Sequence, residues 1–600
     1  MKDPNRVLLT GNEAIARGAY EAGVTVCSAY PGTPSTEIFE NLAQYKDVLY
    51  AEWAPNEKVA AEVAYGACIA NSRSLTAMKH VGLNVAADLV FTAAYNGVGA
   101  GFVLVSADDP DMHSSQNEQD NRRYAQFAKI PLIEPSDSQE CKDFMKEAYA
   151  ISERFEIPVL FRVTTRISHS KSLVSLGERE EQTPARYVRN IPKYNCAPGF
   201  ARQHHPLLEE KLKQLEAYAN TSPLNTMELN GSKVGVISAS VAYQYAKEVF
   251  PADTSFLKLG FSWPLPMDLI RDFASKVEKL YIVEELEPFM EEQIKAAGIA
   301  CIGKSAIPNL FELNPEVVRH GVFGEESETA QLDVKMVARP PALCPGCPHR
   351  SSFYILRKLK VPVNGDIGCY TLGVAPPLNV IDTCGCMGAG IGVAHGAAIS
   401  GDTERHVAVI GDSTFFHTGI PALLNVAYNQ SNVITIIMDN RITGMTGHQE
   451  NPGTGATLQG KETIHLDLET LVRSLGIEKV KTVDAYAVKE IETTLKTWMK
   501  EDGPAVLITR EECALLPTAR KRWMPLGVDQ EKCIGCGICL RTGCPALIKS
   551  DVLHKKNGRP LTRIDPLLCT GCEICAQVCP QDAILFRKQI LAEQEAQAGV

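Results

Sequence analysis

The sequence predicts an α/β protein built from doubly wound parallel sheets and ending in a small cysteine-rich unit. Along residues 1–170, apolar strand-like runs such as Val24–Tyr30 alternate with amphipathic stretches such as Lys58–Ala70. Strand–helix alternation is typical of parallel α/β sheets. The pattern returns after residue 231, and eight of the 19 cysteines lie between Cys533 and Cys579.

The chain length predicts several domains rather than one. Charge, Pro and Asn are enriched in 171–230, where we expect a linker or wrapping segment with one helix at Leu207–Tyr218. Arg339-Pro340-Pro341 marks a further boundary. We expect an α/β domain in 1–170, the linker in 171–230, a second α/β domain in 231–335, a third in 336–523 and the cysteine-rich domain in 524–590.

Composition excludes several classes of protein. Hydrophobic residues make up 45% and charged residues 22%, which is ordinary for a globular chain. The net charge of −11 argues against nucleic acid as a partner, because phosphate binding needs clustered positive charge. No apolar run approaches the ~18 residues of a membrane span, and the start MKDPNRVLLTGNEA lacks the pattern of a signal peptide. We therefore expect a cytoplasmic protein without a membrane or nucleic-acid partner.

The cysteine-rich domain contains the same pattern twice. Cys533–Cys539 has the spacing CxxCxxC and is followed by Cys544-Pro545, and Cys569–Cys575 repeats the spacing before Cys579-Pro580. In two-cluster ferredoxins the fourth cysteine of each run ligates the other cluster, and this domain resembles the bacterial ferredoxins of that kind. One extra residue before Cys544 lengthens a loop without removing a ligand. Structural zinc knuckles are a poorer fit, because they use two CxxC pairs. The expected ligands are Cys533, Cys536, Cys539 and Cys579 for one [4Fe–4S] cluster, and Cys569, Cys572, Cys575 and Cys544 for the other.

A strand–helix–strand unit in the third α/β domain predicts a metal site. The apolar runs His406–Ile410 and Val433–Met438 flank a helical stretch, Ile420–Asn429. Such crossovers are right-handed, so Asp412 and Asn440 follow the carboxyl ends of two parallel strands, where α/β sheets bind ligands. Carboxylate and carboxamide oxygens suit Mg²⁺.

The same stretch resembles the GDG…N signature of thiamine-diphosphate enzymes, with Ser413 in place of the last glycine. Gly411 would let the backbone approach a phosphate closely. The resemblance implies a main-chain oxygen at about Ile442 as a metal ligand. It also implies a pocket floor for the diphosphate in 382–392, which includes Cys386 and Gly388. The alternatives are an ordinary βαβ unit whose Asp caps a helix and a nicotinamide site, for which the glycine run is a poor match.

Thiamine-diphosphate enzymes also need a glutamate that hydrogen-bonds N1′ of the aminopyrimidine ring. Glu57 opens a helix after a short strand and is our candidate, and Glu52 and Glu62 compete for the role. The alternative is a first-turn glutamate that the helix dipole favours.

Three segments occur in the order seen in 2-oxoacid:ferredoxin oxidoreductases: Ala29–Glu37, the Asn56-Glu57 helix and Lys79–Asn84. Over nearly its whole length the chain is similar to the alpha (large) subunits of the indolepyruvate:ferredoxin oxidoreductase family. The resemblance implies a pyrimidine-binding domain in 1–170, a transketolase-C-terminal-like domain in 231–335 and a diphosphate-binding domain in 336–523. It further implies that Glu57 activates the cofactor and that Thr33 lies near the substrate carboxylate. Pyruvate-specific relatives add an arginine, but the corresponding stretch here, Ser106–Asp109, has none.

Relatives also place a cluster beside the thiamine ring with a CxxC and two distant cysteines. Cys344, Cys347, Cys369 and Cys513 match that layout and are our candidates for a third [4Fe–4S] cluster. The alternative is that Cys369 and Cys513 are buried thiols. Cys384 and Cys386 would compete, but they fall within the diphosphate floor.

The two modules together predict oxidative chemistry. Thiamine diphosphate leaves an electron-rich enamine after decarboxylation, and one-electron clusters can oxidise that enamine in two steps. The resemblance implies conversion of an aryl 2-oxoacid, such as indolepyruvate or phenylpyruvate, to an acyl-CoA, with electrons passed to ferredoxin. It also implies a smaller beta subunit in a heterodimer or heterotetramer. The alternatives are another 2-oxoacid specificity, a non-oxidative thiamine lyase with structural clusters, and a non-catalytic electron-transfer subunit.

Overall fold

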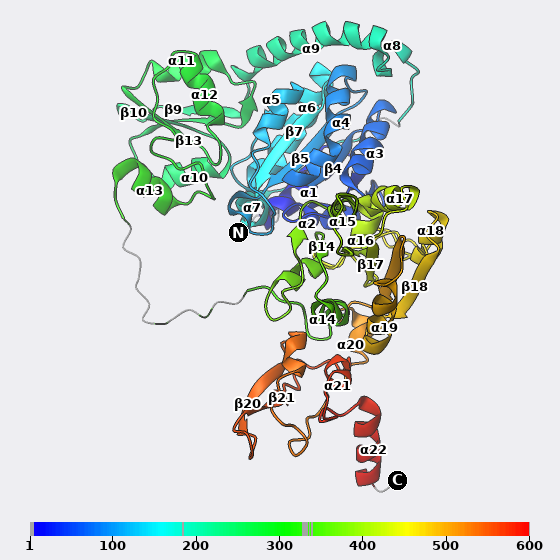
Figure 1. Cartoon of the computed structure of the whole chain (residues 1–600). Coiled ribbons are helices and arrows are strands. Elements are labelled where there is room, and N and C mark those ends of the chain that lie inside the picture. Colours follow the sequence, from blue (N-terminus) through cyan, green and yellow to red (C-terminus); the bar gives the residue numbers. More distant parts are fainter. Residues whose placement is uncertain (1–4, 183–184, 327–333, 335–336, 338–339, 599–600) are drawn as a thin grey trace. The chain divides into compact units, whose positions relative to one another are not determined.

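The computed structural model describes residues 5–182, 185–326, 334, 337 and 340–598. The chain forms two compact units, drawn in Figure 1. Unit 1 comprises Met1–Asp333 with Thr457–Lys461, and unit 2 comprises Val334–Ala456 with Glu462–Val600. The boundary expected at 335/336 and Arg339 lie outside the described residues.

The first sheet of unit 1 has the strand order β12-β6-β7-β5-β4-β2-β3. Its strands are parallel except for β12, which pairs antiparallel with β6. The central strands are buried along their whole length, as the apolar runs predicted. Helix α1 packs on α6, and α3 packs on α4. The bounds are β2 Val26–Ala29, β3 Tyr50–Trp53, β4 Ser74–Lys79, β5 Phe102–Asp108, β6 Leu132–Ile133, β7 Val159–Thr164, β12 Phe261–Trp263, α1 Gly11–Glu21, α3 Glu57–Ile69, α4 His80–Asn96 and α6 Ser138–Phe155.

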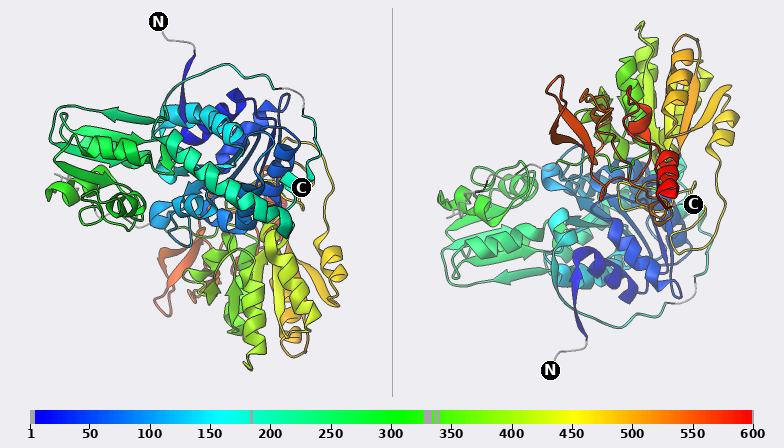
Figure 2. Two further views of the ribbon diagram at one scale, coloured as in Figure 1. Left: turned by 90° about the horizontal axis from the view of Figure 1, so that it is seen from above. Right: turned by 90° about the horizontal axis from the view of Figure 1, so that it is seen from below.

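The stretch expected as a linker has more structure than its composition predicted. Strand β8 (Lys171–Ser175) pairs antiparallel with β1 (Arg6–Thr10). Helix α9 (Pro198–Ala219) is 22 residues long, and Figures 1 and 2 show it beside the first sheet's domain. It contacts α4 and β12. Its buried positions recur at helical spacing and give one apolar stripe: His204, Leu208, Leu215 and Ala219.

The second sheet of unit 1 has the order β13-β10-β11-β9. Strand β9 (Asn225–Glu228) is an antiparallel edge strand, so this sheet begins before residue 231. The remaining strands are parallel. The bounds are β10 Val234–Ser238, β11 Ser255–Leu259, β13 Lys279–Val283, α10 Ser240–Val249, α11 Met267–Ala274, α12 Phe289–Ala296 and α13 Pro315–Phe323.

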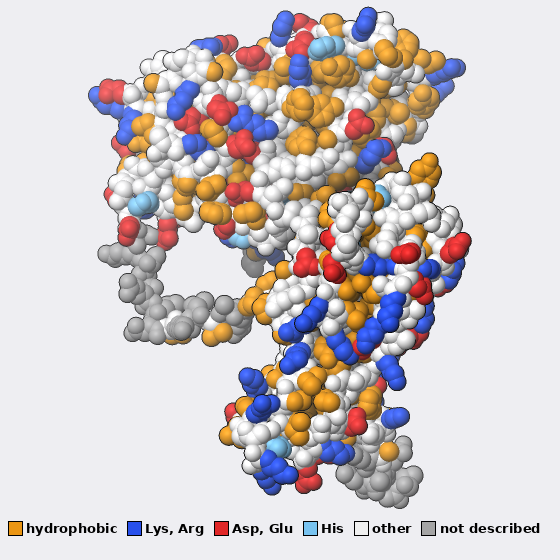
Figure 3. All heavy atoms as spheres, in the orientation of Figure 1, with side chains coloured by type: hydrophobic (Ala, Val, Ile, Leu, Met, Phe, Trp, Pro, Cys, Tyr) orange, Lys and Arg blue, Asp and Glu red, His pale blue; other side chains and the backbone are white. Residues whose placement is uncertain are grey.

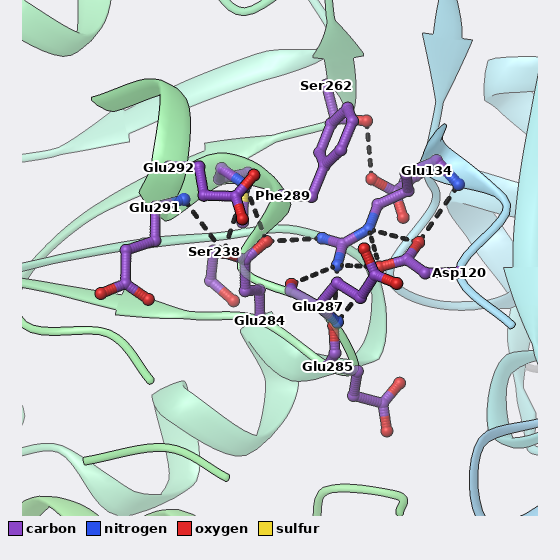
Figure 4. A network of polar contacts seen from close by, with 12 residues as sticks. Asp120, Glu134, Ser238, Ser262, Glu284, Glu285, Glu287, Phe289, Glu291 and Glu292 are labelled. Carbon is purple, nitrogen blue, oxygen red and sulfur yellow. Dashed lines mark hydrogen bonds and ion pairs between the residues drawn. The ribbon is translucent and has the colours of Figure 1, made fainter. Parts of the chain in front are cut away.

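A buried ionic network joins the two sheets of unit 1 (Figure 4). Arg122, the first residue of α5 (Arg122–Ala128), pairs with Asp120 at 2.6 Å and with Glu284, just after β13, at 2.7 Å. Arg162 on β7 pairs with Asp108 at 2.7 Å. These side chains are at most 2% exposed. Buried charges persist only when they are paired, so the network fixes the second sheet against the first.

Unit 2 contains an all-parallel sheet with the order β15-β14-β16-β17-β19-β18. Its predicted strand–helix–strand unit is present, and every end lies within one residue of the expected position. The bounds are β14 Val363–Gly365, β15 Thr383–Cys384, β16 Val407–Gly411, β17 Ile434–Asp439, β18 Lys479–Asp484, β19 Ala505–Arg510, α14 His349–Leu359, α15 Ala389–Ile399, α17 Ile420–Tyr428, α18 Leu468–Ser474 and α19 Val488–Trp498.

The cysteine-rich part of unit 2 is built on a hairpin of β20 (Leu547–Leu553) and β21 (Pro560–Ile564). Figures 1 and 2 show the hairpin at one side of this small domain. Two short helices, α21 (Ile574–Gln577) and α22 (Arg587–Ala598), follow. Among the described residues, no helix combines the length and apolarity needed to cross a membrane.

Candidate functional site

Polar residues meet at one edge of the sheet in unit 2. Strands β14, β16 and β17 are neighbours and run parallel, so their carboxyl ends lie together. Asp366 follows β14, Asp412 follows β16, and Asn440 follows β17. The edge therefore presents two carboxylates and one carboxamide from adjacent strands.

Asp412 and Asn440 meet as the sequence predicted. The end of the Asn440 carboxamide lies 2.8 Å from the Ile442 carbonyl oxygen and 3.2 Å from Asp412 Oδ1. If the amide nitrogen occupies this end, it donates to both oxygens. If the amide oxygen occupies it, three oxygens converge and require a cation.

The surroundings of Asp412 favour a cation. Asp412 is 3% exposed, and its Oδ2 accepts no hydrogen bond from any described residue. Burial, followed by the charge of Asp439, raises the pKa of Asp412 well above its usual range. The ionised form of a buried carboxylate that a nearby negative charge repels becomes favourable when a divalent ion binds to it. The donor set of Asp412, Asn440 and the Ile442 carbonyl fits Mg²⁺, which prefers oxygen ligands.

The chain after β16 has an unusual backbone. Asp412–Thr414 forms one helical turn, and Phe415–Gly419 is a π-helical turn, a feature frequent at functional sites. The Thr443 hydroxyl donates to Ser413 Oγ at 2.9 Å. A Cβ added to Gly411 would lie 2.6 Å from the Tyr370 ring. Gly411 therefore has no room for a side chain, because the Tyr370 ring packs directly on it.

Asp366 organises the predicted diphosphate floor, and the sequence analysis missed it. Its carboxylate accepts hydrogen bonds from the backbone N–H groups of Ile367 and Gly388, both at 2.8 Å, and of Gly390 at 3.0 Å. Burial raises its pKa to about 6, against the opposing effect of these bonds. Gly388 caps α15 at φ +83°, whereas Cys386 is exposed. A polar residue directly after a short strand is the signal that could have identified Asp366, because it also identified Asp412.

Four cysteines of unit 2 gather beside this edge: Cys344, Cys347, Cys369 and Cys513. Burial raises the pKa of Cys369 to about 12, and the next causes are the charges of Cys513 and Cys344. Burial also raises the pKa of Cys347 to about 12, and Cys369 and Cys344 add to the shift. Thiolates this close repel one another, and the iron of a cluster would offset that repulsion.

This cysteine group adjoins the predicted metal ligands. A Cβ added to Gly444 would lie 3.4 Å from both Cys369 Sγ and the Asn440 side-chain nitrogen. The backbone N–H of Cys513 donates to the Asn440 carbonyl at 3.0 Å. Cys369 and Cys513 are therefore neighbours of Asn440, and the structure brings together residues more than 140 positions apart in the sequence.

The cysteine-rich domain groups its cysteines in the crossed pattern. One cavity is lined by Cys533, Cys536, Cys539 and Cys579. In the other group, burial raises the pKa of Cys575, and the next causes are the charges of Cys572, Cys544 and Cys569. Each group contains three cysteines of one run and the fourth of the other, and each fits a four-thiolate cluster.

In unit 1, Glu57 is the first residue of α3, and the side chain of Asn56 caps this helix by accepting from Val59 N–H at 2.9 Å. Glu57 is 5% exposed and packs against α4, since a Cβ added to Gly82 would lie 2.7 Å from Glu57 Oε1. The competing glutamates differ: Glu52 accepts from the hydroxyls of Ser28 and Tyr50, and Glu62 forms an exposed pair with Lys58. Of the three glutamates, only Glu57 is buried.

Thr33 lies in the turn between β2 and α2 (Thr36–Leu42) and is half-buried. Next to this turn lies Lys79, since a Cβ added to Gly32 would lie 3.2 Å from Lys79 Cβ. Lys79 is 9% exposed, and its Nζ donates to the Ser114 carbonyl at 2.6 Å. Burial lowers its pKa to about 8, against the opposing charge of Asp109. Ser106–Asp109, where pyruvate-specific relatives carry an arginine, has none, and the sequence pattern did not identify this lysine.

Comparison with known proteins identifies the family. Residues 17–226 match the model for the thiamine-diphosphate-binding domain of pyruvate flavodoxin/ferredoxin oxidoreductase. Residues 366–509 match the C-terminal binding domain of thiamine pyrophosphate enzymes, and residues 532–583 match a 4Fe–4S dicluster domain. These matches confirm the predicted fold class.

Three similar relatives are all named indolepyruvate oxidoreductase subunit IorA. The protein from Pyrococcus horikoshii is 43% identical, and the alignment covers 96% of each chain. The one from Archaeoglobus fulgidus is 42% identical over 96% of this chain and 97% of that protein. The one from Methanothermobacter thermautotrophicus is 41% identical over 97% of this chain and 98% of that protein. The chain therefore belongs to the indolepyruvate oxidoreductase IorA family, and it is a thiamine-diphosphate-dependent 2-oxoacid:ferredoxin oxidoreductase, as the sequence predicted.

Proposed function

We propose that the chain catalyses oxidative decarboxylation of an aryl 2-oxoacid to an acyl-CoA. One 2-oxoacid, one CoA thiol and two oxidised ferredoxins give one acyl-CoA, one CO2, one proton and two reduced ferredoxins. The aryl preference, with indolepyruvate or phenylpyruvate as substrate, rests on the names of the relatives. The observation that supports the redox assignment is that Cys369 and Cys513 lie next to Asn440, because a cluster held by these cysteines would lie beside the proposed cofactor site.

Thiamine diphosphate supplies an electron sink for the bond to the departing CO2. Asp412, Asn440 and the Ile442 carbonyl would hold Mg²⁺ on its diphosphate, and Asp366 would keep the floor segment with Gly388 in place. Glu57 would hold a proton at N1′ of the aminopyrimidine, a role that suits a buried carboxylate at a helix N-terminus.

Lys79 supplies a cation for the substrate carboxylate. Lys79 is the last residue of β4, and its Cβ lies beside the turn that contains Thr33. Arg162 is unsuitable, because it is buried and paired with Asp108 and Glu134. We propose that Thr33 and Lys79 together orient the carboxylate.

The cysteine groups would hold three [4Fe–4S] clusters, and the one at Cys344, Cys347, Cys369 and Cys513 would receive electrons first. Since the relatives are named as subunits, we propose that a smaller subunit completes a heterodimer or heterotetramer. Coenzyme A and ferredoxin are the other proposed partners.

The test uses the anaerobically purified complex with its smaller subunit. Parent enzyme should reduce a viologen dye when 2-oxoacid and CoA are added together. Glu57→Gln should lower kcat by about 10²–10⁴ at unchanged iron content, because the carboxylate no longer activates the cofactor. Glu62→Gln, a surface control, should match the parent. Release of CO2 and aldehyde without dye reduction would instead establish a non-oxidative lyase. Unchanged turnover of Glu57→Gln would exclude the proposed role of Glu57.

A further inference from the structure

The segment 541–563, which contains the β20–β21 hairpin, is strongly basic in an acidic chain. It has six basic residues and one acidic residue, Asp551, and therefore a net charge of +5, whereas the whole chain carries −11. All six basic side chains are exposed, and none forms an ion pair with another described residue. We call these residues the basic patch: Arg541, Lys549, Lys555, Lys556, Arg559 and Arg563.

Basic side chains elsewhere on the surface are often neutralised. Arg522 pairs with Glu511 and Glu512, and Arg473 pairs with Glu469. Figure 3 shows Lys and Arg side chains in blue over the region of the hairpin. The unpaired charges of the basic patch sum to a positive field that reaches into solvent.

The hairpin lies against one cluster cavity. The side-chain amide of Asn557, in the turn of the hairpin, donates to the Ile534 carbonyl at 3.0 Å. A Cβ added to Gly535 would lie 2.8 Å from the Pro560 carbonyl oxygen. Ile534 and Gly535 separate Cys533 from Cys536, which line the cavity. The basic patch therefore borders the site of the cluster expected at Cys533, Cys536, Cys539 and Cys579.

The other cluster of this domain lies toward the sheet of unit 2. Gly346, between Cys344 and Cys347, has no room for a side chain because Thr570 packs directly on it. Thr570 follows Cys569, a member of the second cysteine group. Electrons from the Cys344 group would therefore enter at the Cys569 side and reach the Cys533 side last.

Two exposed apolar side chains complete the surface. Val552 and Leu553, in the second half of β20, are each 56% exposed and lie among the basic residues of the hairpin. Apolar contacts within a charged rim are typical of transient protein interfaces.

We propose that the basic patch docks an acidic electron-carrier protein over the Cys533 group. This inference rests on the proposed function, since that function supplies the electrons. Each encounter moves one electron from the reduced cluster to the carrier without bond changes, and two encounters serve each 2-oxoacid. Complementary charge speeds encounter and orients the partner, and electron-transfer interfaces are small and short-lived.

The experiment reverses charge in the turn of the hairpin. Lys555→Glu/Lys556→Glu is prepared in the complete holoenzyme with the smaller subunit. Lys489→Glu/Lys500→Glu is the matched control, because Lys489 and Lys500 are also exposed and form no ion pair with a described residue. The electron acceptors are an acidic bacterial-type ferredoxin and, separately, a viologen dye.

The variant should raise KM for the ferredoxin at least tenfold at low salt, and added salt should shrink the difference. Dye reduction and iron content should match the parent, and the control should keep the parent KM. Lys555→Gln/Lys556→Gln should shift KM in the same direction by less. Direct binding of oxidised ferredoxin, measured by titration calorimetry, should weaken in the same order and does not depend on turnover.

Parent KM and parent salt dependence in both variants would overturn the docking proposal. Absence of dye reduction in the parent itself would refute the proposed function instead, so the two failures are distinguishable. Tighter binding of a basic carrier than of the acidic ferredoxin would also overturn the docking proposal.

Discussion

Removal of Arg122 tests the buried network that joins the two sheets of unit 1. Its guanidinium group pairs with Asp120 and Glu284 and also donates to the carbonyls of Glu285 and Glu287. Arg122→Met keeps an unbranched stem and removes the charge. Glu284 then loses its ion-pair partner, and Asp120 keeps only Arg162, whose Nη2 lies 3.8 Å away; both carboxylates are at most 2% exposed. Breaking a buried pair in this way costs about 3–5 kcal/mol.

The cost depends on pH. Burial raises the pKa of Glu284, and the charge of Arg122 is the largest effect that opposes this rise. Without Arg122 the pKa of Glu284 rises further above its unfolded value. A carboxyl with a raised folded pKa binds its proton more tightly when folded, so stability falls as pH rises above the unfolded pKa. The deficit of Arg122→Met should therefore be larger at pH 8 than at pH 5.5.

Scanning calorimetry at the two pH values measures this effect. At about 2 °C per kcal/mol for a large domain, Arg122→Met should lower the midpoint of unit 1 by roughly 6–10 °C at pH 8. Arg123→Met is the control, because Arg123 is 32% exposed and pairs with exposed Glu287 and Glu292, contacts worth about 1 kcal/mol or less. Equal midpoints for the two variants, or a larger deficit at pH 5.5, would refute the reasoning.

Three further predictions concern the site. Lys79→Met should raise KM for the 2-oxoacid about tenfold or more. In the parent, Lys79 has a pKa near 8 and loses its charge as pH rises through that value. The parent kcat/KM should therefore fall over this pH range. The pH–rate profile of the variant should not show this fall. Asp412→Asn should retain less thiamine diphosphate after gel filtration with Mg²⁺, measured by thiamine fluorescence, and equal retention would argue against Asp412 as a ligand. Cys369→Ser should lower bound iron by about 4 atoms per chain, whereas Cys384→Ser should leave iron content unchanged.

Local sequence signals predicted much of unit 2. The apolar runs around Asp412 and Asn440 end within one residue of the observed strands, because each run is buried on both faces and is followed by a polar residue. The CxxCxxC runs were equally clear, because turn and ligands are adjacent in the chain. Asp366 follows the same rule after β14, but that strand has three residues and gives a weak signal.

Long-range pairing could not be predicted. Strand β12 joins the first sheet beside β6 although about 130 residues separate them, and no local pattern in Phe261–Trp263 specifies that partner. The proposed role of Lys79 depends on its burial beside Gly32, which only the folded chain reveals. The partners of Arg122, Asp120 and Glu284, are likewise more than 160 positions apart in the sequence.

A buried arginine connects the cysteine group beside the metal ligands to the cysteine-rich domain. Arg350, on α14, is 1% exposed and donates to the Thr542 carbonyl at 2.8 Å and to the Leu343 and Cys344 carbonyls at 2.7 and 2.9 Å. Carbonyls from both sides of the junction thus accept from one guanidinium group. A lysine cannot reproduce this, because its single ammonium group lacks the planar arrangement of several N–H donors.

The charge of Arg350 acts on both cysteine groups. Burial raises the pKa of Cys347 to about 12 and of Cys572 to about 11, and in each case Arg350 opposes the rise. A cation that stabilises thiolate on both sides also lowers the free energy of an added electron on either side, since both are extra negative charge. Tyr486 also lies at this junction, because its carbonyl accepts from the Gln577 side-chain amide at 2.8 Å while its hydroxyl donates to the Gly346 carbonyl at 2.7 Å. With the proposed clusters bound in both cysteine groups, the packing that holds the cysteine-rich domain on the sheet would also favour passage of an electron across the junction.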